Sequence, residues 1–436
     1  MRRTLYSELL KWKSSVNRKP LLLQGARQVG KTWLLNEFGK NEFDRVAYFN
    51  FEESPKLIPL FEHDMKPLSL IESLQILDGK MIDPEKTMIF FDEIQAAPKA
   101  LTSLKYFYEK APQFHIVAAG SLLGVKVGKS SGFPVGKVNF LDLYPMSFYE
   151  YLSAIGEDLL LRKLLSIKYP AKLEDPIHEL LLKHLRFYFI LGGMPEVVKN
   201  YMKRKDINEA RKIQHDILNA YKRDFSKYSQ PSESIKISEV WDSIPAHLSK
   251  ENKKFKFSEI RKGGRSSRYE SAIEWLKNAG LINLSYNIKT PKIPMIGYRD
   301  LSKFKVFLFD TGLLSALIEI PPEMVLHGSK LFSEYNGAFT ENFVAQELVC
   351  SSSRKELFYW TSKSDAEIDF MLQWRKGITP VEVKSGMSRR LKSLHVYDEK
   401  YSSDVLFRIS PRNFTKDNKF INIPLYSVPS IFSWYF

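Results

Sequence analysis

One segment limits the fold of this 436-residue chain more than any other. Residues 25–32 read GARQVGKT, which matches the pattern G-x-x-x-x-G-K-[ST], and they lie between an apolar run and a segment with helical spacing. Glycines allow backbone N–H groups to approach phosphate oxygens, and the start of a helix favours an anion. In such a loop the lysine neutralises phosphate charge and the Ser/Thr hydroxyl reaches Mg²⁺. We therefore predict that a nucleotide is bound by Gly25, Ala26, Arg27, Gln28, Val29, Gly30, Lys31 and Thr32.

A second motif follows some 60 residues after this loop. The apolar run at residues 88–91 ends in Asp92 and Glu93. Asp92 can hold the Mg²⁺ shell, and Glu93 can polarise the attacking water. A buried strand that runs into an acidic turn would give the same residues, but the loop upstream favours the catalytic interpretation. Ser121, just after the next apolar run, could orient the water or contact the γ-phosphate, or it could cap a turn.

The pattern around these motifs predicts an α/β core over residues 1–150. From residue 20 to residue 144, short apolar runs alternate with longer segments at helical spacing, which is typical of a parallel sheet covered by helices. The predicted strands are residues 21–24, 45–51, 88–91, 114–118 and 138–143. Residues 148–228 then have a helical pattern, with a turn at Gly192, Gly193 and Pro195. We interpret residues 151–235 as a helical lid.

The segment after the lid is strongly basic. Between Lys250 and Arg268, eight basic residues and two acids give a net charge of +6, which is 8 − 2. The order helix, basic connection, helix, strand suits a winged helix over residues 236–328, with residues 267–280 as the recognition helix. We predict contacts with DNA from Lys254, Lys256, Arg261, Lys262, Arg265 and Arg268. Two alternatives stay open, a solvated loop and a basic surface that docks an acidic module.

Acidic residues gather in the C-terminal part of the chain. The strings EIDF (residues 367–370) and VEVK (residues 381–384) resemble the metal-binding hairpin of PD-(D/E)xK nucleases. In that interpretation Mg²⁺ would be held beside a phosphodiester, and a lysine would position the water. The metal ligands would be Glu341 on a preceding helix, Asp369 and Glu382, and the lysine would be Lys384.

The spacing of these acids also predicts a strand register. Side chains alternate between the two faces of a sheet, so the acids share a face only if Asp369 pairs with Glu382 and Glu367 with Lys384. That register requires an even turn, formed either by residues 375–376 or by residues 374–377. A cross-strand ion pair on an exposed face is the simpler alternative, because Glu-x-Lys by itself is a weak signal.

Composition sets broader limits. Hydrophobic residues make up 44% and charged residues 26% of the chain, as in soluble globular proteins, and the length suits several domains. The single cysteine, Cys350, cannot form an internal disulfide, and no apolar run approaches the ~20 residues of a membrane span. A net charge of +15 favours polyanionic partners. We expect a cytoplasmic protein that is not embedded in a membrane and that acts on nucleic acid, with DNA favoured.

Further strings extend the motifs over nearly the whole chain. GARQVGKT, MIFFDE and AAGS are followed by LYPMSFYEYL, LGGMPEVV, VFLFDTGLL, FTENFVAQEL, EIDF and PVEVKSG. Together they resemble the AAA-type P-loop ATPases of bacteria and archaea that carry an uncharacterised C-terminal domain. The resemblance implies an AAA+-type parallel sheet core, a helical lid, a winged helix and a restriction-endonuclease-like α/β domain over residues 329–436. It also implies ATP as substrate and Mg²⁺ as cofactor.

One position departs from that family. Its members carry Gly-Arg after the sensor strand, whereas residues 134–137 of this chain read PVGK. Lys137 is a point charge and does not replace the planar fork with which an arginine spans transition-state oxygens. Either another arginine, such as Arg27 or Arg186, takes that role, or hydrolysis is slow.

Three functions are compatible with these features. The first is a Mg²⁺-dependent ATPase that moves the lid and winged helix and presents nucleic acid to the nuclease-like domain. The second is a slow nucleotide-gated switch whose C-terminal domain binds without cutting, and the third is a scaffold that tethers a protein partner. An arginine supplied by a neighbouring copy would imply a homo-oligomer, whereas a site completed within one chain would permit a monomer.

Overall fold

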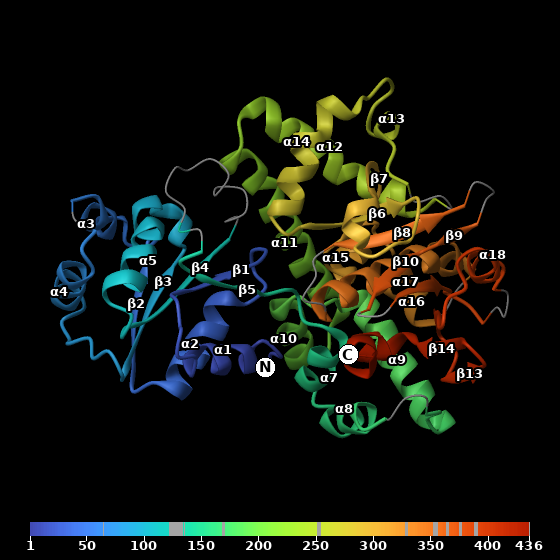
Figure 1. Cartoon of the computed structure of the whole chain (residues 1–436), viewed down its shortest axis with the longest axis horizontal. Helices are drawn as coiled ribbons and strands as arrows, with labels where there is room; N and C mark the ends of the chain where they lie inside the picture. The colour runs from blue at the N-terminus through green and yellow to red at the C-terminus, as the bar shows by residue number, and fades with distance from the viewer. Residues whose placement is uncertain are drawn as a thin grey trace. The chain divides into compact units, whose positions relative to one another are not determined.

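The computed structural model describes residues 1–63, 65–121, 134, 136–167, 171–250, 254–327, 330–351, 356–362, 366–374, 377–387 and 391–435. The chain divides into two compact units, whose elements are labelled in Figure 1. The smaller unit contains Arg2–Tyr144 and Asn278–Gly280. The larger unit contains Pro145–Lys277 and Leu281–Phe436. The modules that the sequence suggested after residue 150 therefore belong to one compact body.

The smaller unit is built on the predicted parallel sheet, and the predicted strands are confirmed. Its strand order is β2-β3-β4-β1-β5, and all neighbours are parallel. Parallel strands end at the same edge of a sheet, so the segments that follow β1, β3 and β4 meet at one edge. The strands are β1 (Leu21–Gln24), β2 (Arg45–Asn50), β3 (Thr87–Asp92), β4 (His115–Gly120) and β5 (Asn139–Asp142).

Helices cover both faces of this sheet. On one face Leu22, Ile89 and Phe91 pack in a single core with apolar residues of α3, α4 and α5. On the other face α2 lies so close that a Cβ on Gly39 would be 2.4 Å from the Val46 side chain. The helices are α1 (Tyr6–Lys13), α2 (Lys31–Glu42), α3 (Ile58–His63), α4 (Pro67–Asp78) and α5 (Pro98–Lys110), with short 3-10 turns η1 (Pro55–Leu57) and η2 (Ile94–Ala96). Strand β3 is buried along its whole length, which explains its continuous apolar run.

The larger unit begins with the helices that the sequence predicted after residue 148. They are α7 (Phe148–Ala154), α8 (Asp158–Leu165), α9 (Asp175–Leu191), α10 (Pro195–Arg204) and α11 (Ile207–Tyr228). Gly192, with φ +69°, ends α9 as expected. A side chain is excluded at this position, because a Cβ there would lie 2.8 Å from Gly312 Cα. Helices α9 and α11 pack against α15 (Thr311–Leu317), and α9 also packs against α16 (Pro322–His327). A role of residues 151–235 as a lid over the nucleotide stays a prediction.

The basic segment lies in a run of helices that leads into a β-hairpin. The order is α12 (Pro231–Leu248), α13 (Phe257–Ile260), α14 (Ser266–Asn278), β6 (Ile282–Ile288), η3 (Met295–Tyr298) and β7 (Arg299–Leu308). The hairpin does not end a separate module, because β6 also pairs with β8 (Leu357–Thr361), which pairs with β9 (Glu367–Ile368). The sheet order β7-β6-β8-β9 thus crosses the boundary that the sequence suggested near residue 328. Helix α17 (Lys330–Ser351) lies between the two parts in sequence.

A second sheet completes the larger unit, in the order β10-β11-β12-β14-β13. Its elements are β10 (Phe370–Gln373), β11 (Ile378–Val383), α18 (Lys392–Tyr401), β12 (Leu406–Ser410), β13 (Thr415–Asp417), β14 (Phe420–Pro424), η4 (Leu425–Ser430) and α19 (Ile431–Tyr435). Strands β10 and β11 pair antiparallel from Phe370 opposite Val381 to Gln373 opposite Ile378. The pairing of Glu367 with Lys384 that the sequence predicted is wrong, because Glu367 pairs with Thr361 of β8 in the other sheet. Asp369 lies just outside β10, so its pairing with Glu382 stays a prediction. The turn is even, since Gln373 pairs with Ile378, but residues 375–376 lie outside the described residues.

Within the segments that the structure describes, no helix is both long enough and apolar enough to cross a membrane.

Candidate functional site

The loop after β1 has a backbone that only glycine can adopt at two positions. Gly25 has φ +149°, and a Cβ built on it would lie 2.1 Å from the carbonyl oxygen of Leu143. Gly30 has φ +94° and is the residue before the first turn of α2. Side chains at either position would be strained or would clash. The glycines of the motif therefore shape a narrow loop that leads into the N-terminus of α2.

Lys31 is buried beneath this loop, with 7% of its surface exposed. Its Nζ donates hydrogen bonds to the carbonyl oxygens of Gly25 (3.0 Å) and Ala26 (2.8 Å). Burial lowers the pKa of Lys31 to about 8, and the nearby carboxylates of Glu93 and Asp92 only partly oppose this. A phosphate group would favour the charged ammonium, so ligand binding and protonation of Lys31 are coupled.

Thr32 and Asp92 meet at the carboxyl edge of the sheet. The Thr32 Oγ1 donates to Asp92 Oδ2 at 2.9 Å, and the hydroxyl of Tyr48 on β2 donates to the same oxygen at 2.9 Å. Asp92 is 3% exposed, and its other oxygen accepts the backbone N–H of Glu93 at 3.0 Å. A hydroxyl and a carboxylate, both oxygen donors, form the kind of ligand pair that Mg²⁺ prefers beside substrate phosphates. The residues present therefore fit a Mg²⁺ ion.

Glu93 is held by two polar side chains. Gln95 Nε2 donates to Glu93 Oε2, and the hydroxyl of Ser121 donates to the same oxygen at 3.4 Å. Ser121 is fully buried just after β4, which lies between β1 and β3 in the sheet. Glu93 itself has φ +49°, a left-handed conformation that is uncommon outside glycine and is often found at functional sites. The structure thus brings Glu93 and Ser121 together, and adds Gln95.

The cations considered in place of the missing arginine lie in different parts of the fold. Arg27, in the loop, forms an ion pair with Glu52 at 3.7 Å. Lys137 precedes β5, so it lies at the opposite edge of the parallel sheet from the loop after β1. It pairs there with Glu109 on α5 at 3.0 Å. Arg186 is exposed on α9 of the larger unit.

The predicted DNA-binding residues are mostly exposed around the start of α14. Lys256, Arg261, Lys262, Arg265 and Arg268 are exposed, whereas Lys254 is half-buried beside β7. Arg261 and Arg268 lie 3.9 and 3.6 Å from the carboxylate of Glu239 on α12. Four apolar residues of this segment are buried in the core, Phe255, Ile273, Trp275 and Leu276, at 8% exposure or less. Phe257 and Ile260 of α13 are only partly buried.

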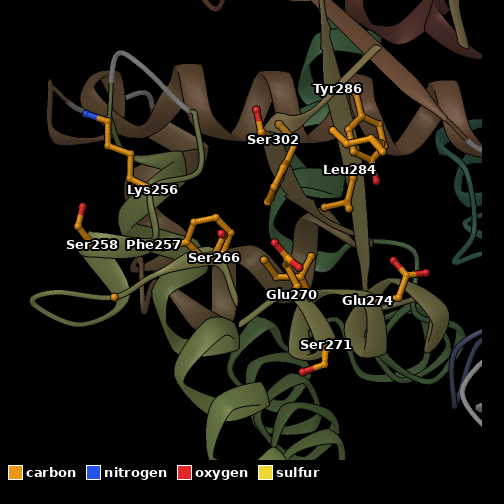
Figure 2. A pocket seen from close by; sticks show the side chains of 14 residues that line it. Lys256, Phe257, Ser258, Ser266, Glu270, Ser271, Glu274, Leu284, Tyr286 and Ser302 are labelled. Atoms are coloured by element: carbon orange, nitrogen blue, oxygen red, sulfur yellow. The ribbon is translucent and has the colours of Figure 1, made fainter. Parts of the chain in front are cut away.

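A cavity of about 1030 Å³ lies beside the same helix, between α13, α14 and the hairpin β6–β7 (Figure 2). Helix α14 contributes Glu270 and Glu274 to its lining, and the hairpin β6–β7 contributes Leu284, Tyr286 and Phe304. Lys256 lines the cavity together with these two carboxylates.

The C-terminal acids are brought together in part, around a lysine that the sequence did not single out. The Nζ of Lys305 on β7 lies 2.5 Å from Glu367, 3.7 Å from Asp369 and 3.8 Å from Glu341. Glu382 instead pairs with Lys384 at 2.8 Å. Among the described residues, no three His, Cys, Asp or Glu side chains are arranged to hold a metal ion. The metal roles of Glu341, Asp369 and Glu382 stay predictions.

A comparison with protein families places the nucleotide site in a known context. Residues 17–152 match the family model described as AAA domain. This range contains the loop, the acids after β3 and Ser121. Residues 17–152 are therefore similar to an AAA domain, and they are called the AAA domain below. Two further segments match models described as Domain of unknown function, residues 182–324 (DUF8612) and residues 336–427 (DUF4143).

Individual relatives resemble only part of this chain or resemble it weakly. Uncharacterized proteins of Mycobacterium tuberculosis (Rv2008c) and Mycobacterium bovis (Mb2031c) are 32% identical over 84 residues, which is 19% of this chain and 18% of each relative. The Walker-type ATPase PABY2304 of Pyrococcus abyssi is 15% identical over 73% of this chain and 95% of its own, with a TM-score of 0.45. The Aeropyrum pernix ORC1 protein in complex with DNA is 15% identical over 75% and 95%, with a TM-score of 0.32. Scores below 0.5 do not establish a shared fold.

Some residues of the AAA domain site carry no signal in the sequence. Tyr48 lies in the middle of an ordinary strand, and Gln95 lies in a short turn after the acids. Their contacts depend on how β2, β3 and β4 align, and this alignment is set by the whole sheet.

Proposed function

We propose that this chain is a Mg²⁺-dependent ATP-hydrolysing switch whose larger unit contacts nucleic acid. The observation that supports it most is the hydrogen bond between Thr32 of the phosphate loop and Asp92 of β3, next to Glu93. A hydroxyl and two acids converge there at the edge where the glycine loop exposes its backbone. Chance placement of an apolar strand would not align these groups at the loop.

Each residue of the AAA domain has a distinct proposed role. The backbone of residues 25–30 and the α2 N-terminus bind phosphate oxygens, and Lys31 offsets their charge. Thr32 and Asp92 would hold Mg²⁺, which neutralises charge on the phosphates when it is bound. Glu93 orients a water and accepts its proton, and Ser121 and Gln95 fix the carboxylate of Glu93 in place.

Steady-state ATP hydrolysis tests this assignment. We expect Lys31→Ala to lose nucleotide binding, and Asp92→Asn to lose Mg²⁺-dependent hydrolysis by at least about 100-fold, as for other groups that stabilise transition-state charge. Lys11→Ala, an exposed lysine of α1 paired only with a neighbouring glutamate in the same helix, is the matched control and keeps wild-type rates. Equal hydrolysis in all four proteins would refute an ATPase site at this loop.

Contact with nucleic acid is proposed at the start of α14, in a winged-helix arrangement of α12–α14 and the hairpin β6–β7. Arg265 directly precedes α14 and Lys262 lies three residues earlier, and both are exposed. Phosphate contacts from such residues release counterions, so each one adds to the salt dependence of binding.

The salt dependence of binding tests this interface. We expect Lys262→Ala/Arg265→Ala to weaken binding to duplex DNA and to reduce the slope of log K against log salt by about 2. Lys199→Ala, an exposed lysine of α10, should change neither. Single-stranded RNA in the same assay distinguishes the two polynucleotides. An unchanged slope would remove α14 from the interface and favour the alternative of a scaffold that tethers a protein.

One observation favours slow turnover. Lys137 lies at the edge of the sheet opposite the phosphate loop and pairs with Glu109, so it cannot reach the γ-phosphate of its own chain. We expect Lys137→Ala to leave the ATPase rate within about twofold of wild type. A rate per chain that rises with protein concentration would indicate that another copy supplies an arginine.

The topology of the C-terminal segment supports a nuclease-like fold, although not cleavage. Helix α17 carries Glu341, Asp369 directly precedes β10, and Glu382 lies in the antiparallel partner strand β11. An acid on a helix followed by acids at a β-hairpin is the order that the resemblance to PD-(D/E)xK proteins implies. Fold alone does not establish chemistry. Lys305 lies beside Glu341 and Asp369 and bears on whether these acids can bind a metal ion.

A further inference from the structure

The inference concerns the buried lysine among the C-terminal acids, and it does not depend on the nucleotide site. Lys305 is 1% exposed, and its ammonium lies within 4 Å of carboxylates of three residues. Those residues are Glu341 of α17, Glu367 of β9 and Asp369, which follows β9. Two of the three are residues that a nuclease-like site would use for its metal.

Strand pairing explains why Lys305 reaches these acids. Lys305 pairs with Ser285 on β6, and Ser285 pairs with Leu357 on β8, so these side chains share one face of the sheet. Tyr359, two residues after Leu357, points to the same face, and its ring centre lies 5.2 Å from Lys305 Nζ. Thr361 follows on that face and pairs with Glu367. The small side chain at Ser285 leaves room for the long lysine to extend across the face toward β9.

The contacts of Lys305 compensate its charge within the cluster. Its Nζ lies 2.5 Å from the carboxylate of Glu367, and the carboxylates of Asp369 and Glu341 lie 3.7 and 3.8 Å away. Asp369 is fixed as well, because its Oδ2 accepts the backbone N–H of Val383 at 2.8 Å. A buried charge with several compensating partners is costly to disrupt.

The net charge shows what the cluster can accommodate. Four acids (Glu341, Glu367, Asp369 and Glu382) and three lysines (Lys254, Lys305 and Lys384) give −4 + 3 = −1. A divalent cation added to this set would meet the ammonium of Lys305 within the same group of oxygens. Without Lys305 the set would carry −2, which one divalent cation neutralises. The residues present therefore do not fit the Mg²⁺ ion that a nuclease-like site requires.

We propose that Lys305 takes the place of the metal ion in this cluster. The acids Glu341 and Asp369 then form no hydrolytic centre, and the cluster serves to fasten the hairpin β6–β7 to α17 and to the strands β9 and β10. The C-terminal segment retains a nuclease-like arrangement of acids with an internal cation in place of Mg²⁺. Lys305 of β7 therefore connects the hairpin β6–β7, which lies next to α14, with Glu341, Glu367 and Asp369.

Binding of Mn²⁺ by the nucleotide-free full chain, followed by electron paramagnetic resonance, tests the proposal. We expect the wild type and Asp369→Asn to bind equal amounts of Mn²⁺, because the cluster holds none. Any ion bound weakly at the AAA domain contributes equally to both proteins. A Mn²⁺ site that is present in the wild type and lost in Asp369→Asn would overturn the proposal. This comparison leaves Lys305 unchanged.

The converse experiment removes the lysine. We expect Lys305→Met, an uncharged side chain one atom shorter than lysine, to gain about one Mn²⁺ per chain at millimolar metal. The gain should disappear in Lys305→Met/Asp369→Asn, and Mn²⁺ should raise the melting temperature of Lys305→Met alone. If the folded Lys305→Met protein gains no site, Lys305 is not what excludes the metal and the proposal is wrong. If that variant does not fold, the comparison of wild type with Asp369→Asn still decides.

Discussion

At the scale of single residues, two buried lysines show how surroundings decide the state of the same side chain. Lys31 faces backbone carbonyls, so burial prevails and lowers its pKa to about 8. Lys305 faces carboxylates of three residues, and its pKa is raised despite complete burial. The first lysine is poised to gain charge compensation from a ligand, whereas the second already has its partners.

The pKa of Lys31 predicts how ATP affinity depends on pH. Phosphates bind the ammonium form, and the free protein loses this proton above about pH 8. ATP affinity should therefore fall as pH rises from 8 to 9.5, by up to about tenfold per pH unit. Fluorescent ATP titrations measure it, and Lys31→Arg, which stays charged, is the control with a flat profile. Parallel profiles for the two proteins would contradict the assignment.

The sequence revealed those residues whose chemistry is encoded in a local motif. Lys31, Thr32, Asp92 and Glu93 could be singled out because spacing and neighbouring apolar runs fix their positions. Lys305 could not, since it meets Glu367 only through the pairing of strands that are far apart in the chain. Nothing in its own neighbourhood distinguishes it from an exposed lysine.

At the scale of elements, the helical strings of the family resemblance meet in one buried polar cluster of the larger unit. Asp310 before α15 accepts the N–H of Leu313 at 2.8 Å and that of Gly193 at 2.6 Å. Glu347 of α17 accepts the N–H of Phe148, the first residue of α7, at 2.9 Å. These strings therefore act in packing and helix capping within the larger unit. Phe148, which donates to Glu347, follows soon after β5, the last strand of the AAA domain sheet.

Glu347 makes the stability of the larger unit depend on pH. Burial raises its pKa to about 8, with a further contribution from Glu150, although the Phe148 N–H and Tyr188 lower it. The folded state thus binds more protons than the unfolded state between about pH 4.5 and 8, and stability falls as pH rises through that window. Asp310, whose pKa burial raises to about 6, acts in the same direction at lower pH.

We expect Glu347→Gln to remove most of this dependence, because the amide oxygen still accepts the Phe148 N–H and cannot ionise. At pH 9 the variant should be more stable than wild type by at least about 1 kcal/mol, and near pH 5 the two should be similar. Urea unfolding at pH 5, 7 and 9 measures it. A variant that is less stable than wild type at pH 9 would show that Glu347 is charged in the folded protein.

Secondary structure and register could be predicted where they depend on nearby residues. The strands of the AAA domain sheet follow from apolar runs, and the register of β10 and β11 follows from an even turn and the alternation of faces. The pairing of β6 with β8 could not be predicted, because strand β7 and the three helices α15, α16 and α17 lie between them in the sequence. The sequence therefore predicted two separate modules on either side of residue 328, whereas β6–β7 and β8–β9 share a sheet in the structure.

At the scale of the whole molecule, the proposed function requires communication between the unit that binds nucleotide and the unit that contacts nucleic acid. Thermodynamic linkage makes this measurable without knowledge of how the units are arranged. If a nonhydrolysable ATP analogue changes the affinity for duplex DNA by some factor, DNA must change the affinity for the analogue by the same factor. We expect a factor of about 5 or more, and none in Lys31→Ala. Independent binding in the wild type would contradict a switch.

The most direct test of the central claim is single-turnover hydrolysis of ATP by the wild type and by Glu93→Gln, with Mg²⁺ and with enzyme in excess. Glutamine keeps the shape of the side chain and its contacts with Gln95 and Ser121, but it cannot accept a proton from water. The account predicts that ATP affinity is retained within a few-fold while the rate of cleavage falls by at least about 100-fold. Cleavage at an unchanged rate would contradict the assignment of catalysis to the acids that follow β3.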